Sequence, residues 1–149
     1  MKPTYTKLAA DGSALPADHP NDGPDRHLAV RVEHDGFPGW SIVVSAYRCE
    51  GKHSFAKAQE VAAAHAAYGW KWRNGSPEEL FLINDRTDPS NSLPKEFFPD
   101  SVDYEWTWTN LVDASSPAGS AWDVSLGDGD SNWNSQSYRY HVRPVLAGQ

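Results

Sequence analysis

Near the C-terminus the chain reads Ala121-Trp122-Asp123-Val124-Ser125-Leu126-Gly127-Asp128-Gly129-Asp130-Ser131-Asn132-Trp133-Asn134-Ser135-Gln136. Trp122, Val124 and Leu126 recur every second residue, which predicts a strand whose core face they form. Asp123 and Ser125 fall between them, so we expect both side chains to face water. The Gly-Asp-Gly-Asp run that follows favours a tight turn, because Gly and Asp tolerate positive φ. The stretch therefore predicts two or three antiparallel strands that carry aromatic and amide side chains outward.

Length and composition predict one domain over residues 1–149, with a loop-rich segment, residues 1–27, packed on it. A chain of 149 residues with 39% hydrophobic residues can build an ordinary core without a metal or disulfides. It contains seven Trp, six Tyr and five Phe, and most of these rings belong in the core. Aromatic side chains also suit boundary positions, so the excess is compatible with a ligand surface.

The charge excludes several partners. A formal net charge of −7 argues against a protein that follows nucleic-acid phosphates, and equally against adsorption to anionic lipid. The single Cys49 excludes an intramolecular disulfide and is expected to act as a small buried side chain. No apolar run approaches the length of a membrane span or a secretion signal. We therefore expect a chain without membrane insertion that is made in the cytoplasm and leaves it by lysis or within a particle.

The order of predicted elements indicates an α+β fold. A first helix begins after Ser54, runs to Ala67 and is ended by Gly69. A second begins at the capping box Ser76-Pro77-Glu78-Glu79 and buries three apolar residues: Leu80, Phe81 and Ile83. Strands are predicted at residues 5–8, 28–32, 40–47 and 104–109, with irregular loops over 17–26 and 84–101.

Four segments give the chain a family resemblance. They are Tyr5-Thr6-Lys7-Leu8 with Asp11-Gly12 and Leu15-Pro16; Trp72-Arg73 with Glu79-Leu80; Phe97-Phe98-Pro99; and Ala121-Trp122-Asp123-Val124 through Tyr140-His141-Val142-Arg143-Pro144-Val145. In these the chain resembles the C-type-lectin-like domain at the C-terminus of the collagen-like adhesin Lcl, a family of bacteria and bacteriophages. The resemblance implies a C-type-lectin-like fold with two helices and a small twisted antiparallel sheet. It also implies recognition rather than catalysis, since similar domains bind polysaccharides as adhesins, are displayed on phage particles, or are diversified in their terminal hairpin.

Three segments depart from the family pattern. Asn74-Gly75-Ser76-Pro77 stands where relatives have Leu-Pro-Thr, and Trp106-Thr107-Trp108-Thr109-Asn110 replaces a Trp-Ser-Ser segment. A third family segment survives only as Asp35-Gly36-Phe37-Pro38-Gly39-Trp40. The resemblance therefore carries over the fold and leaves ligand specificity open.

The predicted contact residues centre on Trp133. An exposed ring there can stack on a sugar or a protein while neighbouring polar groups supply hydrogen bonds. The candidate set is Asp130, Asn132, Trp133, Asn134 and Gln136 on the hairpin, with Trp108 and Asn110 before it. The alternative is that Trp133 packs across the sheet on Tyr138 or Tyr140, and burial is the better explanation for Trp106 and Trp108 if they lie on a strand.

A calcium loop is the alternative interpretation of the acidic turn. Asp128, Asp130, Asn132 and Asn134 alternate like the first ligands of such a loop. An EF-hand, however, needs Gly where Trp133 stands and Glu where Arg139 stands. We therefore predict a plain hairpin turn, no metal site and no cofactor, and keep calcium as the alternative.

Catalytic motifs are not apparent. The six histidines show no paired metal spacing, and the chain has no Gly-x-Ser-x-Gly elbow. The formylglycine-generating enzymes, a related C-type-lectin-like family, rely on two cysteines, whereas Cys49 stands alone. Glu78 and Glu79 are better explained as charges near a helix N-terminus than as an acid and base.

The sequence thus predicts a non-enzymatic binding or display module. We expect a bacteriophage virion-associated protein on the capsid or tail, located in the virion and part of a homo-oligomer or larger assembly. Its expected partners are other virion proteins or a host-surface glycan or protein. A carbohydrate-binding adhesin module of a bacterium is the alternative, and a small hydrolase is a third interpretation.

Overall fold

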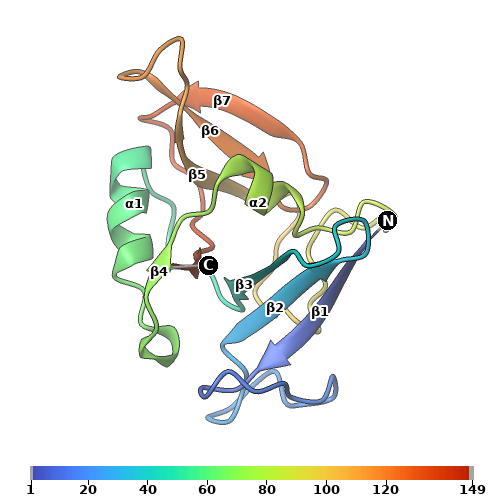
Figure 1. Ribbon diagram of the computed structural model, residues 1–149. Coiled ribbons are helices and arrows are strands. Elements are labelled where there is room, and N and C mark those ends of the chain that lie inside the picture. The colour runs from blue at the N-terminus through green and yellow to red at the C-terminus, as the bar shows by residue number, and fades with distance from the viewer. Residues whose placement is uncertain (1, 148–149) are drawn as a thin grey trace.

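The computed structural model describes residues 2–147, in which helices and antiparallel strands are combined (Figure 1). The elements in chain order are β1 (Pro3–Leu8), β2 (Ala29–His34), β3 (Ser41–Ser45), α1 (Phe55–Ala63), the 3-10 turn η1 (Ala67–Gly69), β4 (Trp72–Arg73), α2 (Pro77–Phe81), β5 (Trp106–Val112), β6 (Ser120–Ser125), β7 (Ser131–Ser135) and β8 (Val145–Leu146). The α+β prediction is confirmed, as is the order of short strands, two helices, a long loop and a terminal sheet.

The strands form two antiparallel sheets at opposite ends of the molecule. One has the order β1-β2-β3-β8-β4 and the other the order β5-β6-β7. Figure 1 shows α1 along one side and α2 between the sheets. The predicted terminal hairpin is present as β6 and β7, with Trp122 opposite Trp133 and Asp123 opposite Asn132.

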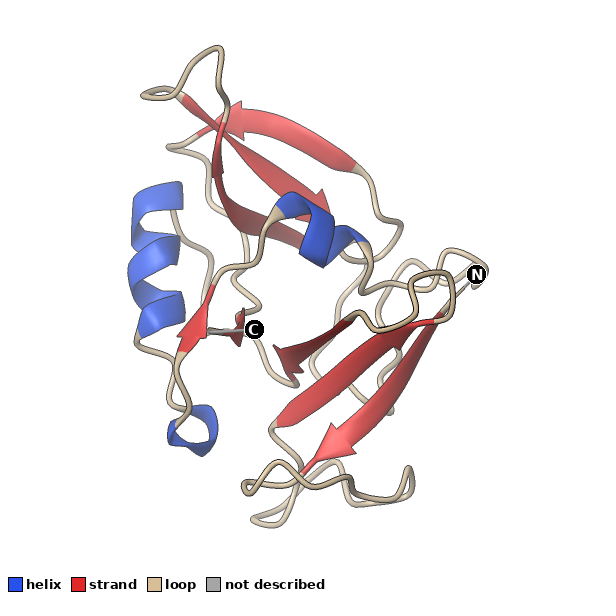
Figure 2. Cartoon of the chain, viewed as in Figure 1, coloured by secondary structure: helices blue, strands red, loops and turns tan. Residues whose placement is uncertain are grey.

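The main core lies between the two sheets and is completed by irregular chain. Val30 and Val44 of the first sheet contribute to the same buried cluster as Val124 of the second. Leu93 and Phe98 join this cluster from the loop region between α2 and β5, which Figure 2 shows as a long tan segment. Burial of these side chains, each about 1.5–3 kcal/mol, explains why a stretch without helix or strand still has a fixed path.

A second buried cluster joins α1 to the terminal sheet. Phe55, Ala58 and Ala62 occupy the buried face of α1 and pack with Trp108 and Ala121. Spacings of three and four residues place these three side chains on one face of the helix. The helix thereby covers one face of the three-stranded sheet.

Helix α1 ends earlier than predicted, at Ala63 rather than Ala67. Ser54 occupies the predicted cap position but makes no side-chain cap hydrogen bond. The chain instead turns so that the His65 ring reaches the Ser45 hydroxyl at 2.8 Å and the Tyr68 hydroxyl donates to the Leu8 carbonyl. Tertiary contacts therefore end the helix earlier than the helix preference of the local sequence would.

Helix α2 has the predicted capping box. The Ser76 hydroxyl accepts from the Glu79 amide at 3.1 Å, and the Glu79 carboxylate accepts from the Ser76 amide at 2.8 Å. Leu80 and Ile83 are buried as predicted, but Phe81 is 37% exposed, contrary to the prediction. Phe81 is one residue after Leu80 and therefore points about a quarter turn away from the core. The Arg86 guanidinium lies over its ring instead.

The N-terminal strand is longer than predicted, and the loop after it is irregular as expected. The Lys7 ammonium is buried and donates to the His19 carbonyl at 2.6 Å and to the Asn21 side chain at 2.8 Å. The Tyr5 hydroxyl donates to the Ile83 carbonyl at 2.6 Å. These two side chains of β1 tie the loop and the chain after α2 to the first sheet.

Arg143 is the most highly connected buried side chain of the described chain. Its guanidinium is fully buried and donates twice to the Glu105 carboxylate, at 2.7 and 2.8 Å. It also donates to Asp100 at 2.7 Å and to the Ser45 carbonyl at 3.0 Å. Burial opposes the positive charge, but the carboxylates of Glu105 and Asp100 raise the pKa of Arg143 above its ordinary value. One cation thus joins the end of β3, the long loop and the chain entering β5.

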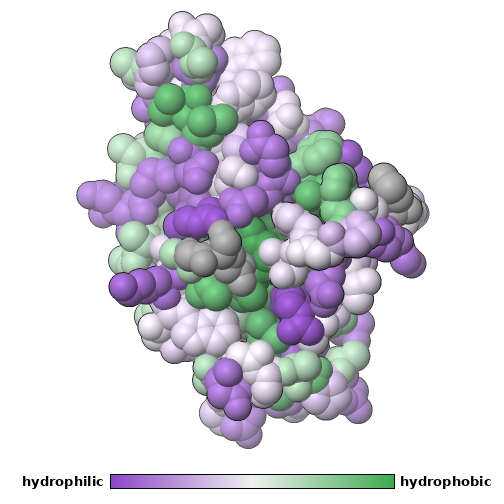
Figure 3. Space-filling view, viewed as in Figure 1, coloured by the Kyte–Doolittle hydropathy of each residue, from purple (hydrophilic) through white to green (hydrophobic). Residues whose placement is uncertain are grey.

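The surface is predominantly hydrophilic, with separate apolar patches on the face shown in Figure 3. Within residues 2–147 no helix combines the length and the apolar character that a membrane span requires.

Replacing Arg143 with Met should destabilise the protein strongly. The variant leaves Glu105 as an uncompensated buried carboxylate, so the free energy of unfolding should fall by about 3–5 kcal/mol in urea denaturation. Arg31→Met is the matched control, because the Arg31–Glu33 pair is largely exposed and its loss should change the value by about 0.5 kcal/mol or less. A loss below about 1 kcal/mol for Arg143→Met would contradict this role.

Candidate functional site

The two faces of the sheet formed by β5, β6 and β7 carry different chemistry. On one face Trp133 is 60% exposed, and its ring lies 5.4 Å from that of Trp122 in an edge-to-face arrangement. The predicted exposure of Trp133 is confirmed. It packs on Trp122 rather than on Tyr138 or Tyr140, so that alternative is wrong. Trp122 itself is only half-buried, contrary to its predicted place in the core, because the sheet extends beyond the core at this point.

The amide side chains predicted to surround Trp133 lie on the opposite face. Successive residues of a strand point to alternate sides, so Asn132 and Asn134 face away from Trp133. Asn132 is the register partner of Asp123, and the Asn134 amide donates to the Asp123 carboxylate at 2.8 Å. The predicted contact set is therefore divided between two faces.

Two of the remaining candidates have structural roles. Trp108 is fully buried, and its indole N–H donates to the His53 carbonyl at 2.8 Å, so it belongs to the core rather than to a contact surface. The Gln136 amide donates to the Pro117 and Ser120 carbonyls, which fixes the loop between β5 and β6.

The other two candidates, Asn110 and Asp130, are exposed. Asn110 is on β5, where its backbone N–H donates to the Gly75 carbonyl. Asp130 precedes β7, and its backbone N–H donates to the Asp128 carboxylate at 3.1 Å. That contact closes the predicted turn. Among residues 2–147, no three or more His, Cys, Asp or Glu side chains are placed to hold a metal ion.

Asp123 departs most from prediction. It was expected to face water, yet the side chain is fully buried. Burial raises its pKa to about 6, although the hydrogen bond from Asn134 acts in the opposite direction. One carboxylate oxygen accepts that bond, while the other, Oδ1, has no hydrogen-bond partner within residues 2–147. A buried acceptor without a donor is uncommon in native proteins and needs an explanation.

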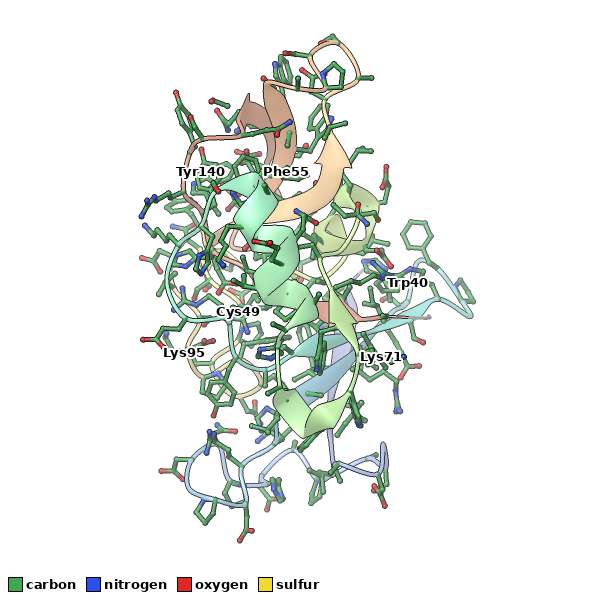
Figure 4. The ribbon with its side chains drawn as sticks, turned by 90° about the vertical axis from the view of Figure 1, so that its left-hand side faces the viewer. Trp40, Cys49, Phe55, Lys71, Lys95 and Tyr140 are labelled. Carbon is green, nitrogen blue, oxygen red and sulfur yellow. The ribbon has the colours of Figure 1, made fainter. Side chains whose placement is uncertain are left out.

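A small cleft of about 130 Å³ lies directly at Asp123. The rings of Trp106 and Tyr140 border it, and the amides of Asn132 and Asn134 complete its lining. Tyr140 is held in place because its backbone exchanges two hydrogen bonds with His53 and its ring packs edge-on against Trp108, with centroids 4.9 Å apart. Figure 4 shows Tyr140 near Phe55, at the start of α1.

A larger hollow of about 460 Å³ adjoins this cleft and shares Trp106 and Tyr140 with it. Three cationic side chains line the hollow: Arg48, Lys52 and Arg139. Arg48 lies 3.5 Å from the Asp100 carboxylate and 3.3 Å from the His141 ring. Burial and the charge of Arg48 lower the pKa of His141 to about 4, so this ring is neutral at pH 7. Asp103 and Glu105 also line the hollow, so its lining combines charges of both signs.

Sequence reasoning missed Asp123, Trp106 and Tyr140 as site residues. The available signal was Asp123 itself, a carboxylate within the apolar alternation of a strand. A two-residue period defines the two faces of a strand but does not indicate which face is solvated. Here α1 covers the face that the pattern alone assigns to water. The proximity of Tyr140 to Trp106 also had no local signal, because it depends on the His141–Trp106 backbone hydrogen bond of 2.9 Å.

A serine–histidine contact was likewise not predicted. His65 Nε2 lies 2.8 Å from the Ser45 hydroxyl, and its Nδ1 lies 3.7 Å from the Cys49 sulfur. The Ser45 hydroxyl, however, donates to the Tyr47 carbonyl at 2.6 Å, so His65 is the donor in their contact. Burial raises the pKa of Cys49 to about 11, which keeps it a thiol. Neither side chain is activated as a nucleophile.

Replacing Asp123 with Asn should change how stability depends on pH. The folded carboxyl has a pKa of about 6 against an ordinary value of 3.8. The folded state therefore keeps the proton up to a higher pH than the unfolded state does. As a result, the free energy of unfolding falls as pH rises from about 4 to about 6. The amide of the variant cannot ionise, so Asp123→Asn should be about 1–3 kcal/mol more stable than the wild type at pH 7.

Urea denaturation at pH 4 and pH 7 measures this difference. The gain in the free energy of unfolding of Asp123→Asn over the wild type should be small at pH 4 and reach its full value at pH 7. Asp128→Asn provides the control, since Asp128 is exposed and its replacement should not reproduce the pH-dependent gain. Equal stability of Asp123→Asn and the wild type at both pH values would contradict the raised pKa.

Comparison with protein families identifies most of the chain. The sequence model of the Lcl C-terminal domain matches residues 29–146, more than three quarters of the chain. The matched region includes every element from β2 to β8. The opening motif at residues 5–16, on which the resemblance also rested, lies outside it. No curated protein matches the chain.

Proposed function

The chain belongs to the Lcl C-terminal domain family, and on that premise we propose that it is a non-enzymatic binding and display module with a C-type-lectin-like fold. The observation that carries this proposal is the Trp122–Trp133 pair on the sheet formed by β5, β6 and β7. Trp133 is the most exposed of the large hydrophobic side chains within residues 2–147, at 60%, so its indole is available to a partner.

The setting that we propose is a bacteriophage particle. The chain is acidic, which favours solubility on an exterior surface, and similar domains are displayed on phage particles. Its partners there are other virion proteins, within a homo-oligomer or larger assembly, and a glycan or protein of the host surface. The alternative is a carbohydrate-binding adhesin module of a bacterium, which uses the same sheet. A hydrolase has less support, because Ser45 and Cys49 are not activated as nucleophiles.

The virion proposal predicts that the chain copurifies with particles. Gradient-purified particles from the lysed host should contain it at a constant ratio to the major capsid protein, as measured by quantitative mass spectrometry. A host cytoplasmic protein measured in the same fractions is the control. Absence from particles, with abundance in the particle-free lysate, would exclude a virion role and favour the adhesin alternative.

Replacing Trp133 with Ala should weaken attachment to the target surface. Loss of an exposed aromatic anchor typically costs about 2 kcal/mol or more, so binding of the labelled protein to host cells or to a glycan array should fall at least about tenfold. Tyr138→Ala is the matched control, because this ring is 53% exposed but outside the Trp122–Trp133 pair. Equal binding of Trp133→Ala and the wild type would argue against this face.

The same assay with a chelator separates the calcium alternative. We expect binding to be unchanged by the chelator, because the acidic turn is closed by its own hydrogen bond between Asp128 and Asp130. Loss of binding that returns when calcium is added would support a calcium-assisted module instead.

A further inference from the structure

We propose that strand β7 pairs with β7 of a second copy of this chain, antiparallel and about a two-fold axis. The three-stranded sheets of the two copies then join into one continuous sheet. This contact rests on the homo-oligomer of the proposed function, to which it adds the surface and the register of contact. Three observations support it: a free backbone edge, the lack of protection on that edge, and a strand sequence that is the same in both directions.

The free edge of β7 follows from its pairing with β6. The order β5-β6-β7 makes β7 the outer strand, and Figure 1 shows it at the outer edge of the molecule. The Asp130 carbonyl accepts from the Ser125 amide at 2.8 Å, which marks a hydrogen-bonded position of the ladder. Such positions alternate along an antiparallel ladder. The backbone groups of Ser131, Trp133 and Ser135 therefore point away from β6.

Other sheet edges of the described chain are protected, whereas the edge of β7 is not. Native edge strands are short, carry charge or proline, or are covered by further chain. The outer strand β1 contains Pro3 and Lys7, and β4 has only two residues. The outer side of β5 is covered, because its Trp108 amide donates to the His141 carbonyl at 3.2 Å. Strand β7, Ser131–Ser135, contains neither a charged residue nor proline.

The sequence of β7, Ser-Asn-Trp-Asn-Ser, is the same in both directions. A two-fold axis at Trp133 therefore places like side chains opposite each other. Trp133 lies opposite Trp133 of the second copy, Ser131 opposite Ser135, and Asn132 opposite Asn134. Cross-strand aromatic pairs stabilise a sheet, and facing amides have both donors and acceptors to exchange. The strand is thus complementary to itself, as a two-fold interface requires.

The same register joins the outward backbone groups. The Trp133 residues of the two copies exchange hydrogen bonds as a pair, and the Ser135 amide of each copy donates to the Ser131 carbonyl of the other. The Ser135 carbonyl already accepts from the Tyr138 amide at 3.0 Å within its own chain. The pairing therefore leaves the turn after β7 unchanged. Backbone hydrogen bonds of this kind supply affinity when a strand is added to a sheet edge.

The local charges select the antiparallel direction. The chain has a net charge of −7, and Asp128 and Asp130 are exposed in the turn before β7. In the proposed register Asp130 lies opposite Gln136 of the second copy, so the two Asp130 side chains are about 20 Å apart. Charges at that separation are screened, because the screening length is about 10 Å at 0.1 M salt. Parallel pairing would instead place the two acidic turns side by side.

The first test is the self-association of the full chain, measured by analytical ultracentrifugation. A contact through one short strand is small, so we expect a weak dimer. The average mass should rise from 16.5 kDa at about 1 µM towards twice that value at about 1 mM. A mass that stays at that of the monomer at about 1 mM would overturn the proposal.

Two double variants test the register. Ser131→Lys with Ser135→Lys places ammonium groups opposite each other in both outer pairs, so the dissociation constant of the dimer should rise about tenfold or more. Ser131→Lys with Ser135→Glu is the matched control, because each ammonium then faces a carboxylate of the other copy and the dimer should be at least as tight as the wild type. Within one chain the two positions are about 13 Å apart, so neither variant creates a close internal pair. Equal effects of the two double variants would overturn the register.

An NMR measurement on the wild type decides the contact should a double variant fail to fold. In a mixture of isotope-labelled and unlabelled chain, the Hα atoms of Asn132 and of Asn134 from the other copy should give an intermolecular NOE, since they form a non-hydrogen-bonded pair with close Cα atoms. A dimer without this NOE uses another surface and would overturn the proposal. Failure here leaves the proposed function to the particle and Trp133→Ala experiments, which measure attachment rather than self-association.

Discussion

The fold depends on the buried guanidinium of Arg143. Its four hydrogen bonds reach Glu105, Asp100 and the Ser45 carbonyl, which belong to segments far apart in the chain. A buried cation is tolerated only where its donors are satisfied, so these segments must meet at one point. That requirement fixes the C-terminal segment between the two sheets. It also sets Tyr140, three residues before Arg143, beside Trp106 at the edge of β5.

A second buried charge has the opposite character. Arg143 is fully paired, whereas Asp123 retains one oxygen without a donor within residues 2–147. The first arrangement stabilises the fold, and the second costs stability at neutral pH because burial disfavours the ionised form. Local costs of this kind gather at functional sites. The contrast separates a buried charge that the fold compensates from one that it leaves partly uncompensated.

Local elements were well predicted because their causes are local. The capping box at Ser76 and the hairpin turn after Leu126 are fixed by neighbouring residues, and both are present. Predictions failed where distant contacts decide. Helix α1 ends at Ala63 because later side chains bond elsewhere, and Phe81 is exposed because five residues of helix bury only one face. The predicted contact set was wrong for the same reason. It grouped the residues around Trp133 because they are close in the sequence, although they lie on two faces of the sheet.

The sequence by itself determined the main elements, their α+β order and the aromatic and amide content of the terminal hairpin, while it left the exposure of Trp133 open. Only the tertiary structure decided that both faces of β6 are buried, the predicted core face with Val124 and also the face with Asp123 and Ser125. The physical reason is that a two-residue period gives two faces but not the position of the core, and α1 covers the face that holds Asp123. Alternation then separates Trp133 from Asn132 and Asn134, and long-range pairing brings Tyr140 to Asp123 to form the cleft.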